Sequence, residues 1–387
     1  MNFEHTHERR LLADSISRYA ADRYGELTRR LVPQPRQHFD PRHWSALAEL
    51  GALGALFTPE QGGFGGDAFD LMVVFEAIGR GLITEPFLAS LMAGRTLAHV
   101  ADPGHATLLA GIVEGTTLAS LAHCESGGQW HPAHAGCTAH RQGDHWVLEG
   151  DKVGVPWGAE ADILLISART SGNFDDEDGL SLFAVPATSP GLTRWGHPDF
   201  DGGRSADMSL RGLTLPPQAL VGAVGRAAGA LKAGIACGIQ AVCAEALGLM
   251  DVMMADTLEY LQTRKQFGAP IGSFQAVQHR MVDLMLQVEQ ARSATLNCAR
   301  HMQADASTRD RCVAAAKFTI STAALKMAQE CIQLHGGIGM TWELPLAHYA
   351  KRLGLLSFQL GDEDFHLARY ASAYATDGVA AASEAGI

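Results

Sequence analysis

The pattern of apolar and polar residues divides the chain into three stretches, and the first, residues 1–116, has the period of helices. In "ERRLLADSISRYAADRYGEL" (8–27), apolar side chains recur every three or four positions and form one helical stripe: Leu11, Leu12, Ile16, Tyr19 and Ala20. Two more helical segments, 43–56 and 69–82, follow. The glycine-rich loop between them, "EQGGFGGDAF", lacks the lysine and the preceding strand of a phosphate-binding loop, so it predicts a structural turn.

Residues 117–222 contain short runs of β-forming residues that are split by Gly, Asp and Pro. The runs are "TLASLAHC", "GCTAHRQ", "HWVLEGDKVGV", "DILLISART", "LSLFAVPA" and "SLRGLTL". Strands of this length and spacing favour a compact antiparallel barrel or sandwich.

The helical period returns at about residue 223 and continues through the rest of the chain. One long apolar pattern is closed by Gly268 and Pro270, and two more occupy 273–302 and 311–337. Long helices with seams of small residues are typical of a bundle. The sequence therefore predicts a mainly α fold with a central β domain. Its parts are an N-terminal helical domain (1–116), a small β-barrel or sandwich (117–222) and a C-terminal helical bundle (223–387).

Composition narrows the classes of function. Apolar residues make up 47% of the 387 residues, charged residues 19%, and the net charge is −12. This acidic balance argues against a nucleic-acid-binding protein, which would show clustered Lys and Arg. It leaves room for an anionic ligand, because a few local arginines can bind phosphate on an acidic protein.

The seven cysteines are widely scattered and include no CxxC pair, so we expect reduced thiols in a cytoplasmic protein and no metal site. The charged start "MNFEHTHERRLLADSI" does not have the apolar core of a signal peptide. No uninterrupted apolar stretch reaches the ~18 residues of a membrane span, so we expect no membrane partner.

Two segments of the last stretch carry candidate ligand-binding chemistry. The first is "TRKQFGAPIGSFQAVQHRMVDL" (263–284), in which Arg264 leaves a helix end as a planar charged fork suited to a pyrophosphate. The second is "QLHGGIGMTWELPLAHYAKR" (333–352), whose glycines allow backbone to approach a ligand closely. Either segment alone would favour an ordinary helix end. Their occurrence together, in this order, favours a binding site.

These two segments and the helix–β–helix order resemble the acyl-CoA dehydrogenase family of flavoproteins, most closely the type named pimeloyl-CoA dehydrogenase small subunit. The resemblance implies that FAD is the cofactor and that Arg264 reaches the FAD of a neighbouring subunit. It implies further cofactor contacts at these positions: Gln266, Phe267, Phe274, Gln275, Gln333, Gly336, Gly337 and Gly339.

The β stretch departs from the family pattern at its two flavin-binding turns. Where the family has a Thr-Glu-Pro-like turn, this chain reads "HCESGG" (123–128), so Cys124 replaces a hydroxyl while Glu125 persists. Where the family has a Trp-x-Thr-like strand, this chain has Gly154 and Pro156. The resemblance still implies that Cys124 contacts the cofactor.

The family reaction, α,β-dehydrogenation of an acyl-CoA thioester, needs a carboxylate base to remove the α-proton. Of the two family base positions, one corresponds to Leu360, just before Gly361, and the other to Gly238. Neither side chain can accept a proton.

Two nearby carboxylates are weaker candidates for the base. Asp362 begins the triplet "DED" after Gly361, where a carboxylate more often caps a helix. Glu245 lies on an apolar helix and could have a raised pKa, but the sequence favours a hydrogen-bonded structural role for it.

Three hypotheses follow: an acyl-CoA dehydrogenase with a displaced base, a half-catalytic or non-catalytic subunit that pairs with a base-bearing chain, and a scaffold of this fold with other chemistry. The resemblance implies an acyl-CoA substrate and a flavoprotein-type electron acceptor. It also implies a homo- or hetero-oligomer built from dimers.

Overall fold

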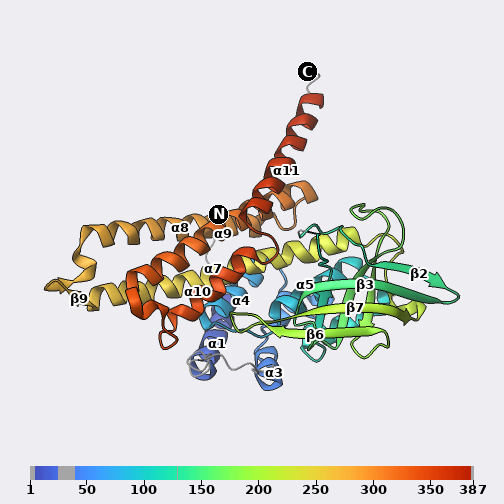
Figure 1. The fold of residues 1–387 in the computed structure, drawn as a ribbon, viewed down its shortest axis with the longest axis horizontal. Coiled ribbons are helices and arrows are strands. Elements are labelled where there is room, and N and C mark those ends of the chain that lie inside the picture. Colours follow the sequence, from blue (N-terminus) through green and yellow to red (C-terminus); the bar gives the residue numbers. More distant parts are fainter. Residues whose placement is uncertain (1–4, 25–39, 129, 385–387) are drawn as a thin grey trace. The chain divides into compact units, whose positions relative to one another are not determined.

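The computed structural model describes residues 5–24, 40–128 and 130–384, with side chains placed up to residue 373. The chain forms two compact units (Figure 1). Unit 1 contains residues 1–34, 68–83 and 239–387, and unit 2 contains residues 35–67 and 84–238. Each unit therefore draws on separate parts of the sequence.

Unit 1 is a helical assembly. Its helices are α1 (His7–Arg23), α4 (Ala68–Gly81), most of α7 (Ala228–Thr263), α8 (Gln275–His301), α9 (Ala306–His335), α10 (Leu346–Phe358) and α11 (Glu363–Glu384). Side chains cap two of the helix starts: the Thr6 hydroxyl accepts from Arg9 N–H, and Asp305 accepts from Thr308 N–H at 3.0 Å. The helical prediction for the last stretch is confirmed.

Helices α4 and α7 cross at a pair of glycines. A Cβ on Gly79 would lie 2.1 Å from the Glu245 carbonyl oxygen, and a Cβ on Gly248 would lie 2.1 Å from the Glu76 carbonyl oxygen. No other residue type can occupy these two positions at this separation of the helices. Arg80 reinforces the crossing, because its guanidinium binds Glu76 on its own helix and Asp251 on α7, at 2.9 and 3.0 Å.

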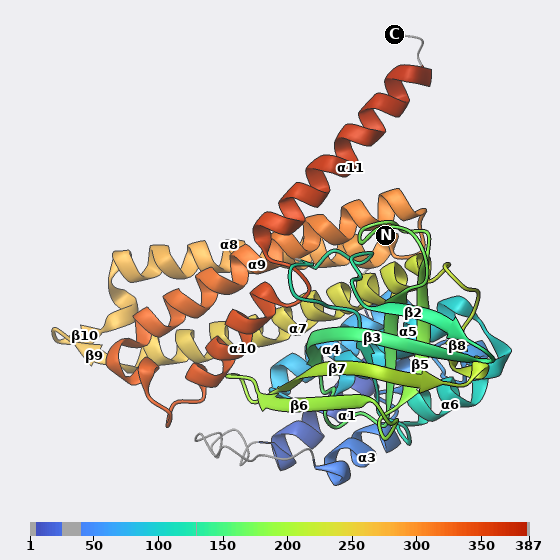
Figure 2. The same ribbon diagram turned by 45° about the vertical axis from the view of Figure 1, so that its right-hand side comes forward.

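Unit 2 combines helices α3 (Pro41–Glu49), α5 (Phe87–Val100) and α6 (Ala106–Glu114) with an eight-stranded sheet. The strands are β1 (Ala119–Ala122), β2 (Thr138–Gln142), β3 (His145–Pro156), β4 (Ile163–Arg169), β5 (Leu180–Pro186), β6 (Leu192–Pro198), β7 (Arg204–Leu215) and β8 (Leu220–Val221). The main path runs β6-β7-β3-β2-β4-β5-β8, and β1 pairs with β4. Figures 1 and 2 both show β3, β7 and β6 side by side.

The antiparallel prediction for this sheet is wrong in one region. β1 pairs with β4 in parallel over four residues, and β2 meets β4 in parallel at Thr138 and Arg169, so the sheet is mixed. Antiparallel neighbours can be joined by short turns, whereas a parallel pair needs a longer crossover. Here the chain passes through β2 and β3 between β1 and β4.

The core of unit 2 lies against this sheet. Leu148, Leu164 and Phe183 are at most 1% exposed, and the Trp146 ring meets Phe183 edge to face at 5.4 Å between centroids. Each fully buried side chain of this size stabilises the fold by about 1.5–3 kcal/mol. These inward-facing apolar side chains therefore form the core that holds the sheet.

Helix α7 is long and apolar enough to cross a membrane by length and composition alone. Its most apolar 18-residue window has a mean hydropathy of 1.6, and 89% of that window is buried inside the protein. Burial of this kind accounts for the apolar sequence of a core helix.

Candidate functional site

Arg264 directly follows α7 and starts a small hairpin. Strands β9 (Lys265–Gln266) and β10 (Ala269–Pro270) pair across a turn in which Phe267 has a φ of 55° and Gly268 a φ of 82°. Two successive residues with positive φ are the mark of the tight type I′ hairpin turn. This turn leaves the Phe267 side chain 93% exposed at the tip.

Phe274 and Gln275 stand at the start of α8, beside the hairpin. The Phe274 ring lies edge-on to Phe267, with 6.3 Å between centroids, and the backbone of Ile271 donates to the Arg264 carbonyl at 2.9 Å. Gln266 and Gln275 are both exposed. The hairpin and the start of α8 therefore present a cation, two amides and two aromatic rings to the outside.

The second motif ends α9 and turns into the short helix η6 (Gly336–Met340). Gly336 closes α9 with a φ of 68° and a ψ of −146°, a conformation that side chains disfavour. A Cβ on Gly336 or Gly337 would meet no atom within 4 Å, whereas one on Gly339 would lie 2.8 Å from the Ile332 carbonyl oxygen. The glycine pair thus borders open space, and Gly339 is required by packing.

One aromatic contact joins the two motifs. Tyr260, in the last turn of α7, stacks on His335 at 4.4 Å between centroids, and its hydroxyl donates to the His335 carbonyl at 3.2 Å. The Arg264 hairpin and the glycine pair after α9 therefore occupy the same end of unit 1. The exposed amide of Gln333 lies on the last turn of α9.

This end of unit 1 fits FAD by the chemistry of its donors. Among the described residues, the exposed Arg264 guanidinium has no hydrogen-bond or ion-pair partner and is free to bind a pyrophosphate. The amides of Gln266, Gln275 and Gln333 can donate to flavin carbonyls or ribityl oxygens. The open space beside Gly336 and Gly337 leaves room for a ligand against the backbone.

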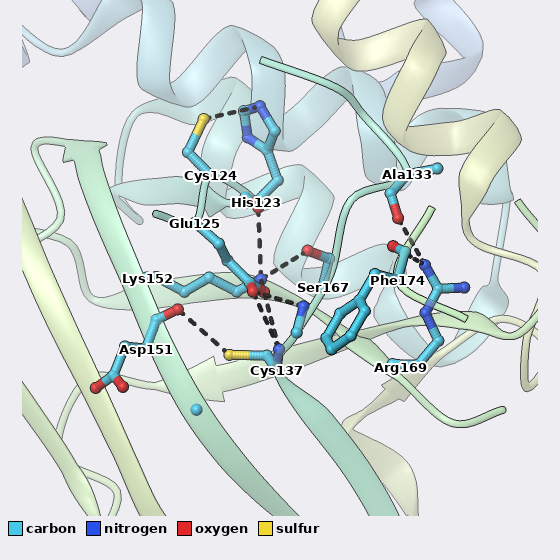
Figure 3. Close-up of polar contacts among 12 residues, drawn as sticks. His123, Cys124, Glu125, Ala133, Cys137, Asp151, Lys152, Ser167, Arg169 and Phe174 are labelled. Carbon is cyan, nitrogen blue, oxygen red and sulfur yellow. Dashed lines mark hydrogen bonds and ion pairs between the residues drawn. The ribbon is translucent and has the colours of Figure 1, made fainter. Parts of the chain in front are cut away.

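Cys124 belongs to unit 2, where it follows β1. Figure 3 shows its thiol beside the His123 ring, with 3.3 Å between Sγ and Nε2. Burial alone would raise the pKa of the Cys124 thiol, but the neighbouring His123 and the Lys152 charge outweigh it and lower this pKa below its usual value.

Glu125, the family residue that persists in this turn, forms a buried ion pair that the sequence analysis missed. The Lys152 ammonium is fully buried and donates to Glu125 Oε1 at 2.6 Å and to Ser167 Oγ at 3.0 Å (Figure 3). Gly136 N–H donates to the second carboxylate oxygen at 2.6 Å. Burial raises the pKa of Glu125, but the attraction of Lys152 and the hydrogen bonds lower it overall.

Only one sequence signal pointed toward Lys152. The lysine occupies an inward position of a strand whose other inward residues are apolar, and an inward lysine needs a buried acceptor. The partner could not be named, because Glu125 is 27 residues away in the sequence. The other departures, Gly154 and Pro156, lie in β3, where Gly154 N–H donates to Asp207 at 2.9 Å.

The family base positions carry no carboxylate in the structure. Leu360 has a φ of 61°, unusual for a residue with a side chain, and Gly361 follows with a φ of 110°. His366 Nε2 lies 2.9 Å from the Leu360 carbonyl oxygen, and the buried Lys317 ammonium donates to the Gly361 carbonyl at 2.8 Å. The turn that precedes α11 is therefore held by a buried histidine and a buried lysine.

Asp362 makes the hydrogen bond of a helix cap. Its Oδ1 accepts from Phe365 N–H at 2.8 Å, at the first turn of α11. The capping role considered for the acidic triplet is present in the structure. The catalytic role of Asp362 stays a prediction.

Glu245 is 2% exposed and pairs with Arg352 of α10 through both carboxylate oxygens. Arg352 Nε lies 2.6 Å from Oε1, and Nη2 lies 2.9 Å from Oε2. A bidentate pair of this kind commits both oxygens to the guanidinium. This geometry favours the structural role over that of a base, and the arginine partner was not foreseen from the sequence.

Comparison with known proteins connects this fold and site to a family. The family model described as acyl-CoA dehydrogenase, N-terminal domain, matches residues 6–105, and the model for the C-terminal domain matches residues 230–374. A relative named probable acyl-CoA dehydrogenase YngJ, from Bacillus subtilis, is 27% identical over 88% of this chain and 90% of its own length.

Solved structures agree with these matches. The ChsE4-ChsE5 complex from Mycobacterium tuberculosis is similar with a TM-score of 0.85 and 26% identity, covering 97% of this chain and 99% of that one. A variant of the Tcur3481-Tcur3483 steroid ACAD has a TM-score of 0.85 and 28% identity, covering 96% and 99%.

The fold and the donor-rich end of unit 1 thus define a flavoprotein of the oxidoreductase class. The chain belongs to the acyl-CoA dehydrogenase family, and FAD is its cofactor. The family resemblance and the predicted fold class, mainly α with a central β domain, are confirmed. The narrower pimeloyl-CoA dehydrogenase small-subunit type stays a prediction.

Proposed function

We propose that the chain is a base-lacking, FAD-binding subunit of a heteromeric acyl-CoA dehydrogenase that converts an acyl-CoA thioester to the enoyl-CoA. The observation that carries this proposal is that each candidate carboxylate already binds another group of the protein. Glu245 is paired with Arg352, Asp362 caps α11, and the family base positions are Leu360 and Gly238. A base must have a free oxygen within reach of the α-proton.

The roles of this chain's residues would be binding and orientation. Arg264 would hold the cofactor pyrophosphate, and Gln266, Gln275 and Gln333 would donate to its polar groups. When bound, FAD supplies the acceptor for the hydride from the β-carbon. Phe267 and Phe274 would exclude water from one side of the cofactor site by covering it with apolar surface.

The exposure of these side chains supports an oligomer built from dimers. Phe267 is 93% exposed at a hairpin tip, and a large apolar side chain in that position is typical of a surface that another chain covers. The proposal takes the covering chain to be the base-bearing partner. Two of the similar solved structures, Tcur3481-Tcur3483 and the ChsE4-ChsE5 complex, are named as pairs of proteins, as such an assembly would be.

Three further features of the proposal come from the sequence and from the similar proteins. The electron acceptor would be another flavoprotein, and the protein would work in the cytoplasm. The substrate would be an acyl-CoA. Steroid side-chain thioesters are the first to try because one similar protein is named a steroid ACAD, and dicarboxylyl thioesters follow from the family resemblance.

The test is to purify the chain alone and mix it anaerobically with a panel of acyl-CoA thioesters. We expect a yellow protein whose flavin absorbance persists, because the family base positions hold Leu360 and Gly238, which cannot accept a proton. Bleaching by any member of the panel would show that this chain holds a working base. A colourless protein that takes up no added FAD would favour the scaffold hypothesis instead.

A further inference from the structure

Cys124 differs from Cys137, Cys243, Cys312 and Cys331 in its electrostatic surroundings. Burial raises the pKa of Cys137 and of Cys243 to about 12, raises that of Cys331 to about 11, and also raises that of Cys312. The pKa of Cys124 is lowered instead, because His123 and Lys152 oppose the effect of burial. Cys124 is also partly exposed, whereas Cys137, Cys243 and Cys331 are buried.

The geometry around the thiol comes from three segments of unit 2. His123 Nε2 lies 3.3 Å from Sγ, and the Lys152 ammonium from β3 donates to the His123 carbonyl at 3.5 Å and to Ser167 of β4. The one anion in this cluster, Glu125, is neutralised by Lys152 at 2.6 Å and by backbone N–H groups. A thiolate here faces two groups that can carry positive charge and one compensated carboxylate.

One ring nitrogen of His123 is buried beside the thiol without a hydrogen-bond partner in the described part of the chain. Its side chain belongs to a residue only 8% exposed, and its ring stands directly beside the thiol in Figure 3. The other ring nitrogen, Nδ1, is buried and has no hydrogen-bond partner among the described residues. A buried polar atom without a partner is uncommon, and a ligand group can satisfy it.

We propose that Cys124 and His123 form a nucleophilic thiolate site that is alkylated by α,β-unsaturated carbonyl compounds. The thiolate sulfur attacks the β-carbon, and a C–S bond forms while the C=C π bond breaks. The electron pair moves to the α-carbon as an enolate, which takes a proton from the His123 imidazolium or from water. Atoms and electrons balance without an oxidant.

The site gives one candidate for the natural electrophile, an enoyl thioester. This compound is the product of the proposed function, and only this part of the inference rests on that function. The addition would place a thioether on the turn after β1, at the residue that the family resemblance assigns to cofactor contact. It would therefore make the chain sensitive to accumulated product.

The first test follows alkylation of each cysteine in the purified protein by N-ethylmaleimide, using peptide mass spectrometry over a range of pH. We expect Cys124 to react about tenfold or more faster than the partly exposed Cys312 at neutral pH. The midpoint of its rate against pH should lie below the value of about 8.5 for an ordinary thiol. Equal rates, or a midpoint at or above that value, would overturn the proposal.

His123→Gln separates the electrostatic effect from packing, because glutamine can still donate to the sulfur but carries no charge. We expect the pH midpoint of Cys124 alkylation to be higher in this variant than in the wild-type chain. The buried Cys137 of the same unit reports on folding and should stay slow to react. An unchanged midpoint with Cys137 still protected would contradict the role of His123.

The second test supplies crotonyl-CoA directly, so that no turnover is needed. We expect a mass increase of one crotonyl-CoA on the peptide that contains Cys124, and none in Cys124→Ser. A protein in which N-ethylmaleimide labels Cys124 quickly while crotonyl-CoA leaves it unmodified would overturn the enoyl thioester as the ligand. This result would leave the proposed dehydrogenation untouched, because that reaction is tested by flavin bleaching.

Discussion

Lys152 donates hydrogen bonds from β3 to Glu125, to Ser167 and to the His123 carbonyl, so one buried ammonium ties three segments of unit 2 together. An ion pair of this kind contributes little net stability compared with an apolar pair of the same shape. Removal of only one member is costly, since the other charge stays buried without a partner.

We therefore expect Lys152→Met to lower the free energy of unfolding by about 3–5 kcal/mol, because it leaves the Glu125 carboxylate uncompensated. The double variant Lys152→Met with Glu125→Gln should recover part of this loss. Urea unfolding followed by circular dichroism measures both. A loss below about 1 kcal/mol in the single variant would show that Glu125 finds other compensation.

The two candidate carboxylates of unit 1 should respond differently to neutralisation. Asp362→Asn keeps a good capping residue, so we expect a cost of about 1 kcal/mol or less and no change in FAD content. Glu245→Gln removes the negative charge that faces the buried Arg352 guanidinium, and we expect a loss of about 2–3 kcal/mol. Denaturant unfolding compares the two variants, and a reversed order would contradict the structural roles assigned to them.

At the level of elements, the turn between α10 and α11 depends on buried titratable groups. Lys317 of α9 donates to the carbonyls of Leu356, Ser357 and Gly361, and burial lowers its pKa to about 8. His366 is fully buried, and burial is the main reason that its pKa is lowered to about 4. Both groups lose affinity for protons on folding.

The sign of the pH dependence follows for His366. Its pKa is lower in the folded chain than the usual 6.5, so between about 6.5 and 4 the unfolded chain binds a proton that the folded chain does not. Stability should therefore fall as the pH drops through this range, by up to about 3 kcal/mol from this group. In His366→Gln that part of the slope should disappear, as measured by urea unfolding at several pH values. An unchanged slope would remove His366 as its source.

The elements show where sequence patterns succeed and where they stop. The helices of unit 1 were predictable because apolar residues recur at helical spacing and because Gly268 and Pro270 close the longest pattern. Strand β6 was missed because it is an edge strand with mostly exposed residues and no apolar alternation. The parallel pairing of β1 with β4 depends on contacts between distant segments, which no local pattern reports.

The residues of the candidate site also fall into those that a local sequence pattern reveals and those that only the fold reveals. Arg264 and the glycines after α9 were found because each has a local signature at a helix end. Two ion pairs were not found, because their members are far apart in the sequence. Lys152 and Glu125 are 27 positions apart, and Glu245 and Arg352 are 107 positions apart. Only the fold shows which buried charge neutralises which.

At the level of the whole molecule, cofactor retention should depend on Arg264. We expect Arg264→Ala to weaken FAD binding by about 2 kcal/mol, roughly 30-fold in Kd, because the variant loses the guanidinium that binds the pyrophosphate. The neighbouring Lys265→Ala removes a cation without the planar fork and serves as the matched control. The measurement is the flavin-to-protein ratio after gel filtration, and equal retention in both variants would remove Arg264 from the site.

The central claim is that this chain binds FAD but lacks the catalytic base, and the most direct test is anaerobic flavin reduction in the wild-type chain and in Leu360→Glu. The variant places a carboxylate beside Gly361, where the family keeps its base. Dehydrogenation is restored only if the α-carbon of the substrate lies within reach of the new carboxylate, because a base misplaced by ~1 Å can lower the rate ~100-fold. We predict that acyl-CoA thioesters leave the wild-type flavin oxidised and bleach the flavin of Leu360→Glu. Bleaching of the wild-type flavin by the chain alone would contradict the account.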